Sequence, residues 1–236
     1  MNQDSAPVTI DATPFTAMIF GASGSIGQAM VIEVLKHYPN ATIYRFARHL
    51  ERLMPKSALN LTRPGQILDI FWDLNQPEVL QKDLLKLFEP SLQPLKIDLI
   101  FIASGFLHDA QQMPEKTYKT LQAAHLMRSY QLNAIGPILT LQSLLMTMDL
   151  KHPCKIGVLS ARLGSISDNR MGGWHSYRAS KAALNMLLKN LAIELQRKRA
   201  PITLVGLQPG TTESDLSNIF TKNIDPQNLQ TPAFTA

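Results

Sequence analysis

The sequence predicts one α/β domain built on a doubly wound parallel sheet. Three observations lead to this prediction. Short apolar segments alternate with helical patterns along residues 15–207. The chain has 236 residues, of which 45% are hydrophobic, and this is enough to bury the core of a single large domain. A glycine-rich turn, Gly21–Gly27, lies between the first predicted strand and the first predicted helix.

Six strands are expected, each a short run of apolar, aromatic or β-branched residues. They cover Phe15–Phe20, Ala41–Phe46, Ile67–Trp72, Ile97–Ala103, Lys155–Leu159 and Ile202–Leu207. The fourth lies in the longest apolar stretch of the chain, which Asp98, Ser104 and Gly105 interrupt. That stretch is too short and too polar to span a membrane, so it is interpreted as a buried strand.

Helical segments separate these strands. They cover Ile26–Tyr38, a helix opening near Asn75, two helices within Thr117–Met148, and Tyr177–Arg197. Pro39 and Asn40 end the first helix, and Pro77 occupies the first turn of the second, where proline is tolerated. Apolar residues three and four positions apart mark the last helix. They are Ala183, Met186, Leu187, Leu191 and Leu195.

The two ends of the chain are expected to lie outside this pattern. Residues 1–14 are polar, contain two prolines and are predicted to form a flexible arm. The domain is predicted to span residues 15–220, and residues 221–236 to form an irregular tail.

Composition excludes several classes of protein and site. The single cysteine, Cys154, excludes an internal disulfide framework and a cysteine-based zinc site, and no metal site is expected. Residues 1–14 lack a secretory leader pattern, so a cytoplasmic location is expected. The net charge is +5, but positive residues cluster tightly only at Arg197–Arg199, near a helix end where the dipole favours them. Neither nucleic acid nor a membrane is therefore an expected partner.

Gly21, Gly24 and Gly27 carry the first chemical signal. Gly21 would permit the tight turn, Gly24 the approach of backbone to a pyrophosphate, and Gly27 close packing of helix on strand. The helix N-terminus adds N–H groups and partial positive charge for phosphate. The alternative is a glycine-rich turn that binds nothing. The flanking strand and helix favour a Rossmann-type dinucleotide site.

Tyr177 and Lys181 carry the second signal, because residues four apart share one helix face. A nearby ammonium lowers the pKa of a phenol from its usual value of about 10, which would make the tyrosine an acid or base near neutral pH. This spacing also arises by chance, so a helix pair without a chemical role remains the alternative.

Taken together, these motifs resemble the short-chain dehydrogenases/reductases. The likeness rests on the glycine-rich turn, on Asn133 in the helical region before the fifth strand, on Tyr177 with Lys181, and on Pro209-Gly210 after the sixth strand. It covers residues 15 to about 220. Residues 160–185 further resemble the branch that contains sniffer-type carbonyl reductases and the bacterial C-signal protein.

The resemblance implies roles for individual residues. Tyr177 would exchange a proton with the substrate oxygen, Lys181 would hold the nicotinamide ribose and tune Tyr177, and Asn133 would keep a water in the proton relay. Besides Tyr177 and Lys181, the implied cofactor-binding residues are Gly21, Ser23, Gly24, Ser25, Ile26, Gly27, Asp73, Leu74, Ser104, Gly105, Pro209, Gly210, Thr211 and Thr212. Among these, Asp73 would contact the adenine amino group and Leu74 would lie in the adenine pocket.

Arg48 favours NADP(H) as the cofactor, with NAD(H) as the alternative. It follows the second strand, where the 2′-substituent of the adenosine ribose would lie, and Arg45 is close to it. A 2′-phosphate favours an arginine, whereas a free 2′-hydroxyl favours a carboxylate, and no acidic residue ends this strand. The other interpretation is that both arginines are only solvated.

Several features depart from the family pattern. The glycines are spaced three and three, where most members space them four and two. The position of the family's catalytic serine falls on Ala161, which cannot donate a hydrogen bond. Ser165 or Ser160 would replace this serine, and Ser165 is preferred. Alternatively, no residue replaces it and the rate of hydride transfer is low. The Asn-Asn-Ala-Gly usual after the fourth strand is replaced by Ile102–Gly105. The last helix and seventh strand are expected to be absent.

The sequence thus predicts an NADP(H)-dependent oxidoreductase that transfers hydride between the nicotinamide and a small or medium carbonyl or secondary alcohol substrate. The alternative is a non-catalytic signalling or regulatory protein that binds a dinucleotide on the same scaffold, which Ala161 favours. The resemblance also implies a homodimer or a higher homo-oligomer.

Overall fold

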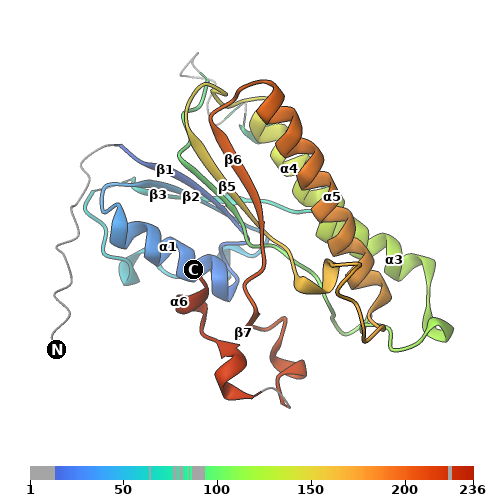
Figure 1. The fold of residues 1–236 in the computed structure, drawn as a ribbon. Coiled ribbons are helices and arrows are strands. Elements are labelled where there is room, and N and C mark those ends of the chain that lie inside the picture. Colours follow the sequence, from blue (N-terminus) through green and yellow to red (C-terminus); the bar gives the residue numbers. More distant parts are fainter. Residues whose placement is uncertain are drawn as a thin grey trace, which may run out of the picture.

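The computed structural model describes residues 14–63, 65–76, 79, 82–84, 86, 94–222 and 225–236. Its centre is a six-stranded sheet with the order β3-β2-β1-β4-β5-β6, in which all neighbouring strands are parallel (Figure 1). The strands are β1 (Thr16–Phe20), β2 (Thr42–Ala47), β3 (Ile67–Phe71), β4 (Leu99–Ile102), β5 (Cys154–Leu159) and β6 (Ile202–Leu207). The chain reverses its direction across the sheet between β1 and β4, the place where doubly wound folds bind ligands. The predicted Rossmann-type fold is confirmed.

Helices lie on both faces of this sheet (Figure 1). They include α1 (Ser25–His37), α3 (Ala123–Tyr130), α4 (Gly136–Leu145) and α5 (His175–Arg197). The core is correspondingly divided in two. Because side chains alternate along a strand, Ala17 and Ile19 of β1 pack in the cluster of α1, while Met18 and Phe20 pack in the cluster of α4 and α5.

A π-helical turn, Gln131–Ile135, joins α3 to α4. The two helices expected within Thr117–Met148 therefore form one helical segment with a bulge in its middle. Such bulges are frequent at functional sites, and this one contains the buried side chain of Asn133. The helix expected near Asn75 and the arm expected at residues 1–14 fall largely outside the described residues.

The C-terminal segment is more regular than expected. Leu229–Gln230 forms β8, which pairs in parallel with β7 (Thr211–Thr212) in a separate small sheet. The short helix α6 (Pro232–Thr235) packs against α1. The prediction of a tail without helix or strand was wrong for these residues, because pairing with β7 and packing on α1 order a segment of weak local propensity.

β6 is an edge strand of the six-stranded sheet. Val205 and Leu207 of this strand remain 43% and 37% exposed. Within the described ranges, no helix is long and apolar enough to cross a membrane, and no cluster of three potential metal ligands is found.

Candidate active site

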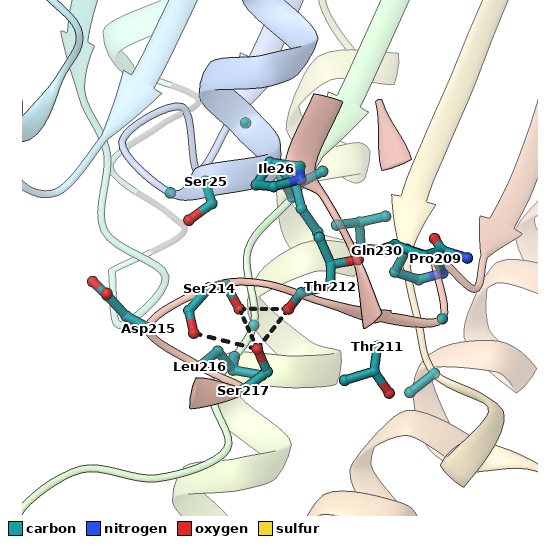
Figure 2. Close-up of a pocket in the computed structure, with 18 of the residues that line it drawn as sticks. Ser25, Ile26, Pro209, Thr211, Thr212, Ser214, Asp215, Leu216, Ser217 and Gln230 are labelled. Carbon is teal, nitrogen blue, oxygen red and sulfur yellow. Dashed lines mark hydrogen bonds between the residues drawn. The ribbon is translucent and has the colours of Figure 1, made fainter. Parts of the chain in front are cut away.

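One large cleft, of about 1570 Å³, opens at the carboxyl ends of the central strands. Residues from most of the chain line it. Among the residues named from the sequence, these are Ser23, Gly24, Ser25, Ile26, Gly27, Ser104, Gly105, Ser160, Tyr177, Lys181, Pro209, Gly210, Thr211 and Thr212. Figure 2 shows Ser25 and Ile26 of α1 around this pocket together with Thr211, Thr212 and residues 214–217. The fold thus brings the glycine-rich turn and the Tyr177 helix to a single site.

The glycine-rich turn has the geometry expected of it despite its unusual spacing. Gly21 has a φ of +76°, and a Cβ there would lie 3.0 Å from Ser104 N. A Cβ on Gly27 would overlap the carbonyl oxygen of Gly21, so both positions require glycine. Gly24 lies at the N-cap of α1 and donates through its N–H to Gly21 O at 3.0 Å.

The first turn of α1 offers donors for an anionic ligand. It contains no acidic residue, and no side chain caps it. First-turn N–H groups have no acceptor within their helix, and they favour a phosphate. Close to the turn, the hydroxyl of Ser104 is buried and makes no hydrogen bond within the described structure. These donors fit the pyrophosphate of a dinucleotide.

Tyr177 and Lys181 lie one turn apart on α5 and are 9% and 3% exposed. Lys181 Nζ is 5.9 Å from the centre of the Tyr177 ring. Burial lowers the pKa of Lys181 to about 8 and raises the pKa of Tyr177 to about 12. The prediction that Lys181 would lower the pKa of Tyr177 was wrong for this structure. Burial of the phenol is the cause of the raised pKa of Tyr177, and burial also disfavours the ammonium of Lys181.

Asn133 connects the loop after β4 to α5. Its Oδ1 accepts from Phe106 N at 2.7 Å, and its Nδ2 donates to Phe106 O at 2.8 Å and to Ser180 Oγ at 3.1 Å. Ser180 Oγ in turn donates to Tyr177 O at 2.8 Å. Asn133 does not line the cleft, and both ends of its carboxamide are bonded within the protein. Its relay role stays a prediction.

The two candidate serines are not equivalent. Ser160 lines the cleft, but its hydroxyl donates to Asn185 Oδ1 at 2.6 Å. Ser165 lines only a second cavity, of about 800 Å³, and accepts from Asp168 N at 3.3 Å. Its position argues against the preference for Ser165. Ala161 lines the main cleft and offers a methyl group there.

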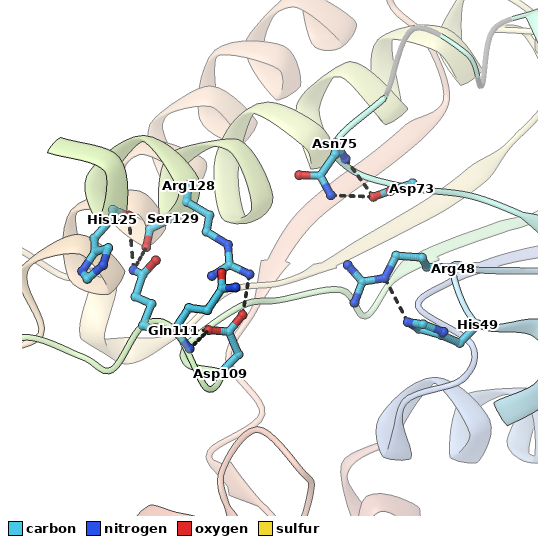
Figure 3. A network of polar contacts seen from close by, with 10 residues as sticks. Arg48, His49, Asp73, Asn75, Asp109, Gln111, His125, Arg128 and Ser129 are labelled. Carbon is cyan, nitrogen blue, oxygen red and sulfur yellow. Dashed lines mark hydrogen bonds and ion pairs between the residues drawn. The ribbon is translucent and has the colours of Figure 1, made fainter. Parts of the chain in front are cut away.

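Four residues expected at the cofactor do not line the cleft: Gly21, Arg48, Asp73 and Leu74. Arg48 Nε donates to His49 Nε2 at 3.2 Å, and Asp73 Oδ1 accepts from the backbone and side chain of Asn75 (Figure 3). Leu74 is buried and packs against Gly136, where a Cβ would overlap it.

The neighbouring arginines differ in their availability. Arg45 is 2% exposed and forms two hydrogen bonds to Asp69, at 2.6 and 2.9 Å, so it is committed to the fold. Arg52, in the turn after β2, lines the cleft and pairs with Asp215 at 2.7 Å. Arg52 was not among the residues predicted from the sequence to bind the cofactor. The available signal was a second arginine, four residues after Arg48, in the segment that follows the second strand.

Aromatic side chains form the wall beside Tyr177. The ring of Trp174 lies 6.3 Å from that of Tyr177 and 4.8 Å from that of Phe220, measured between centres. His108 lies 5.4 Å from Phe220 and hydrogen-bonds to Leu216 O at 3.1 Å. The segment 216–220 therefore packs over this end of the cleft.

Comparisons with known proteins agree with this geometry. The sequence model of the short chain dehydrogenase family matches residues 15–225. The 1-hydroxy-2-glutathionyl-2-methyl-3-butene dehydrogenase of Rhodococcus sp. (strain AD45) is 30% identical over 126 residues, 53% of this chain and 51% of that protein. The C-signal protein of Myxococcus xanthus is 31% identical over 93 residues, 39% of this chain and 55% of that protein. The chain spans about half the length of the curated relatives it matches.

Solved structures share the fold over nearly the whole chain. A short-chain dehydrogenase/reductase from Burkholderia multivorans with bound NADP has a TM-score of 0.72 and 25% identity, and covers 92% of this chain and 85% of that one. The carbonyl reductase Sniffer of D. melanogaster has a TM-score of 0.73 and 22% identity, and covers 94% and 88%. The Sniffer likeness concerns the fold alone.

Proposed function

The chain belongs to the short-chain dehydrogenase family, and we propose from this membership that it transfers hydride between NADP(H) and a carbonyl or secondary alcohol substrate. The observation that carries the proposal is the position of Tyr177 and Lys181 in the same cleft as the glycine-rich turn. The first turn of α1 and Ser104 would hold the pyrophosphate, Lys181 the ribose, and Pro209–Thr212 the nicotinamide end. The bound nicotinamide supplies or accepts the hydride.

The protonation states of the two residues at neutral pH are those that the reduction of a carbonyl group requires. With a pKa of about 12, Tyr177 keeps its proton at neutral pH and is available as an acid. It donates this proton to the carbonyl oxygen as the carbonyl carbon gains hydride, and an alcohol results. With a pKa of about 8, Lys181 is mainly an ammonium at neutral pH. Its charge stabilises the phenolate that Tyr177 becomes.

NADP(H) is proposed over NAD(H) because β2 ends at Ala47 without an acidic residue and Arg48 follows it directly. The acidic residue of the next turn, Glu51, contacts His49 at 3.0 Å. Arg52 lines the cleft and Arg48 precedes it in the same turn. The Burkholderia multivorans protein, solved with NADP, supports the same choice. We propose that Arg52 releases the carboxylate of Asp215 when the cofactor binds and contacts the 2′-phosphate instead. Arg48 would be the second contact of this phosphate.

The wall of the cleft supports a proposal about the substrate. Trp174 and Phe220 make the wall beside Tyr177 apolar, which suits a carbonyl compound of small or medium size.

Exposed apolar side chains support a proposal about the assembly. On the helices of Asn133 and Tyr177, the side chains of Met127, Ile135 and Met186 are 66%, 40% and 61% exposed, and a second copy of the chain would bury them. A homodimer or higher homo-oligomer is therefore proposed, and a cytoplasmic location stays a prediction.

A second candidate function is a regulatory protein that binds the dinucleotide without turnover. Ala161 favours it, because no serine hydroxyl is offered at that point of the cleft. Loss of one such donor costs on the order of a hundredfold or more in rate. The relative from Myxococcus xanthus is named C-signal, and this name refers to a signal and not to a reaction. The similarity to it is consistent with this candidate.

Two measurements test the proposed function. Thermal unfolding of the purified chain should shift upward more with NADPH than with NADH, because a ligand that binds only the folded state stabilises it. Turnover should then be measured over a panel of aldehydes, ketones and diketones, in wild type and Tyr177→Phe. The variant should bind NADPH within about twofold of wild type and lose turnover. Full activity of Tyr177→Phe contradicts the assignment, and binding without any turnover in wild type favours the regulatory candidate.

A further inference from the structure

The helix that carries Tyr177 begins without a cap of its own. Its N-cap residue is Trp174, which has a left-handed φ of 51°, and it follows Gly172 and Gly173 at φ values of 65° and 66°. Trp174 makes no side-chain cap bond, and the first turn holds no acidic residue. Because Ser176 is buried at 1% exposure, the donors of this turn need acceptors from another part of the chain.

Glu115 provides these acceptors from the loop between β4 and α3. Its carbonyl oxygen accepts from Trp174 N at 2.5 Å, and its Oε2 accepts from Ser176 N at 3.1 Å. Its Oε1 accepts from the hydroxyl of Ser176. Three contacts of one residue therefore converge on the two positions at the start of α5.

The carboxylate of Glu115 is electrostatically suited to this position. It is only 3% exposed, and it lies at a helix N-terminus, where the macrodipole favours negative charge. Burial raises the pKa of Glu115, but hydrogen bonds from Ser176 and backbone groups, with the charge of His125, hold it below its usual value. An ionised acceptor makes hydrogen bonds roughly twice as strong as a neutral one.

We propose that Glu115 is a positioning residue that fixes the first turn of α5 and thereby the directions of Tyr177 and Trp174 in the cleft. Tyr177 follows Ser176 directly, so a shift of the bonded turn moves its ring. Trp174 is held through its backbone, and its ring packs against Phe220 in the cleft wall. The catalytic part of this inference rests on the proposed function, whereas the structural part does not.

The first test needs no substrate. Hydrogen exchange should be compared in wild type, Glu115→Ala, Glu115→Gln and the matched control Glu194→Ala. Glu194 is on the same helix but exposed, and it pairs with Lys198 at 2.7 Å. Glu115→Ala should speed exchange of the Ser176 amide tenfold or more, because it removes the carboxylate that accepts from it. The variant keeps the backbone carbonyl that accepts from Trp174 N, and residues 184–191 should be unchanged. Glu115→Gln should be intermediate, because the amide keeps one acceptor, and Glu194→Ala should match wild type at residues 174–178.

The second test compares the effect of the Glu115 variants on kcat with their effect on the Kd of NADPH. In Glu115→Ala, kcat should fall about tenfold to a hundredfold, the cost of a misplaced reacting group. The Kd of NADPH should stay within twofold, and Glu115→Gln should recover most of the loss. Unchanged exchange in both Glu115 variants, or a loosened turn with wild-type kcat, overturns the inference. If wild type shows no turnover, the proposed function fails, while the exchange still decides whether Glu115 fixes the turn.

Discussion

Lys181 donates through Nζ to the carbonyl oxygen of Leu159 at 3.0 Å, which fixes its ammonium at the end of β5. The approach of the two segments depends on Gly164, since a Cβ there would lie 2.8 Å from Lys181 C. The loop after β5 therefore lies directly on α5 and removes water from the lysine. Burial lowers the pKa of Lys181 to about 8, and this determines how its contribution to stability varies with pH.

The first prediction concerns stability without added cofactor. Between pH 8 and pH 10.5, the free energy of unfolding of wild type should rise with pH relative to Lys181→Met. The lowered pKa means that the unfolded state binds more protons in this window, so stability is gained as pH rises and lost as it falls through 8. The slope approaches about 1.4 kcal/mol per pH unit.

Urea unfolding followed by circular dichroism checks this prediction at several pH values from about 7.5 to 9.5. Equal pH slopes for wild type and Lys181→Met would contradict a lowered pKa of Lys181.

The second prediction restores a hydroxyl to the cleft. Ala161→Ser should raise kcat on a carbonyl substrate by about tenfold to a hundredfold, because an added donor stabilises the charge that develops on the substrate oxygen. Steady-state kinetics with saturating NADPH measure it. The control is Ser160→Ala, which should change kcat less than about twofold. A hundredfold loss in that control would identify Ser160 as the catalytic serine instead.

The third prediction separates the arginines near the adenosine end. Arg52→Ala should weaken NADPH binding about tenfold to a hundredfold and leave NADH within twofold, since a hydrogen bond to a charged group contributes about 1.5–3 kcal/mol. Asp215→Asn should strengthen NADPH binding, because it removes the carboxylate that competes for Arg52. Isothermal titration measures both. A larger effect from Arg48→Ala than from Arg52→Ala would return the phosphate contact to Arg48.

The fourth prediction concerns the glycine-rich turn. Gly27→Ala should destabilise the protein by about 1–3 kcal/mol and abolish NADPH binding, since its Cβ overlaps Gly21 O and overpacking is relieved only by moving the turn. Gly24→Ala is the matched control, because its Cβ would lie 3.4 Å from Gly21 O, and it should cost less stability. Thermal melts with and without NADPH compare the two. Similar melting temperatures would show that position 27 tolerates a side chain.

The strands and the motifs that form the site were predictable from the sequence, because each of them depends on a local sequence pattern. The sixth strand was predicted at Ile202–Leu207 and is observed there, and the other five strands of the large sheet differ by one or two residues at their ends. The strands β7 and β8 were not predicted. Apolar periodicity and turn residues determine such elements through neighbouring positions alone. The glycine-rich turn, Tyr177 with Lys181, and Pro209–Thr212 each occupy one short segment, so their meeting in the cleft follows from the parallel strand order.

Only the tertiary structure decided the pKa values of these groups, the directions of their side chains and their hydrogen-bond partners. Burial by segments from elsewhere in the chain sets the pKa of Tyr177, and no spacing along α5 contains that information. Asn185 determines where the hydroxyl of Ser160 donates, and Asp215 meets Arg52 from 163 residues away. Glu115 caps a helix that begins about 60 residues later. Desolvation and long-range hydrogen bonds depend on which distant segments pack together, whereas local propensity depends only on neighbours in sequence.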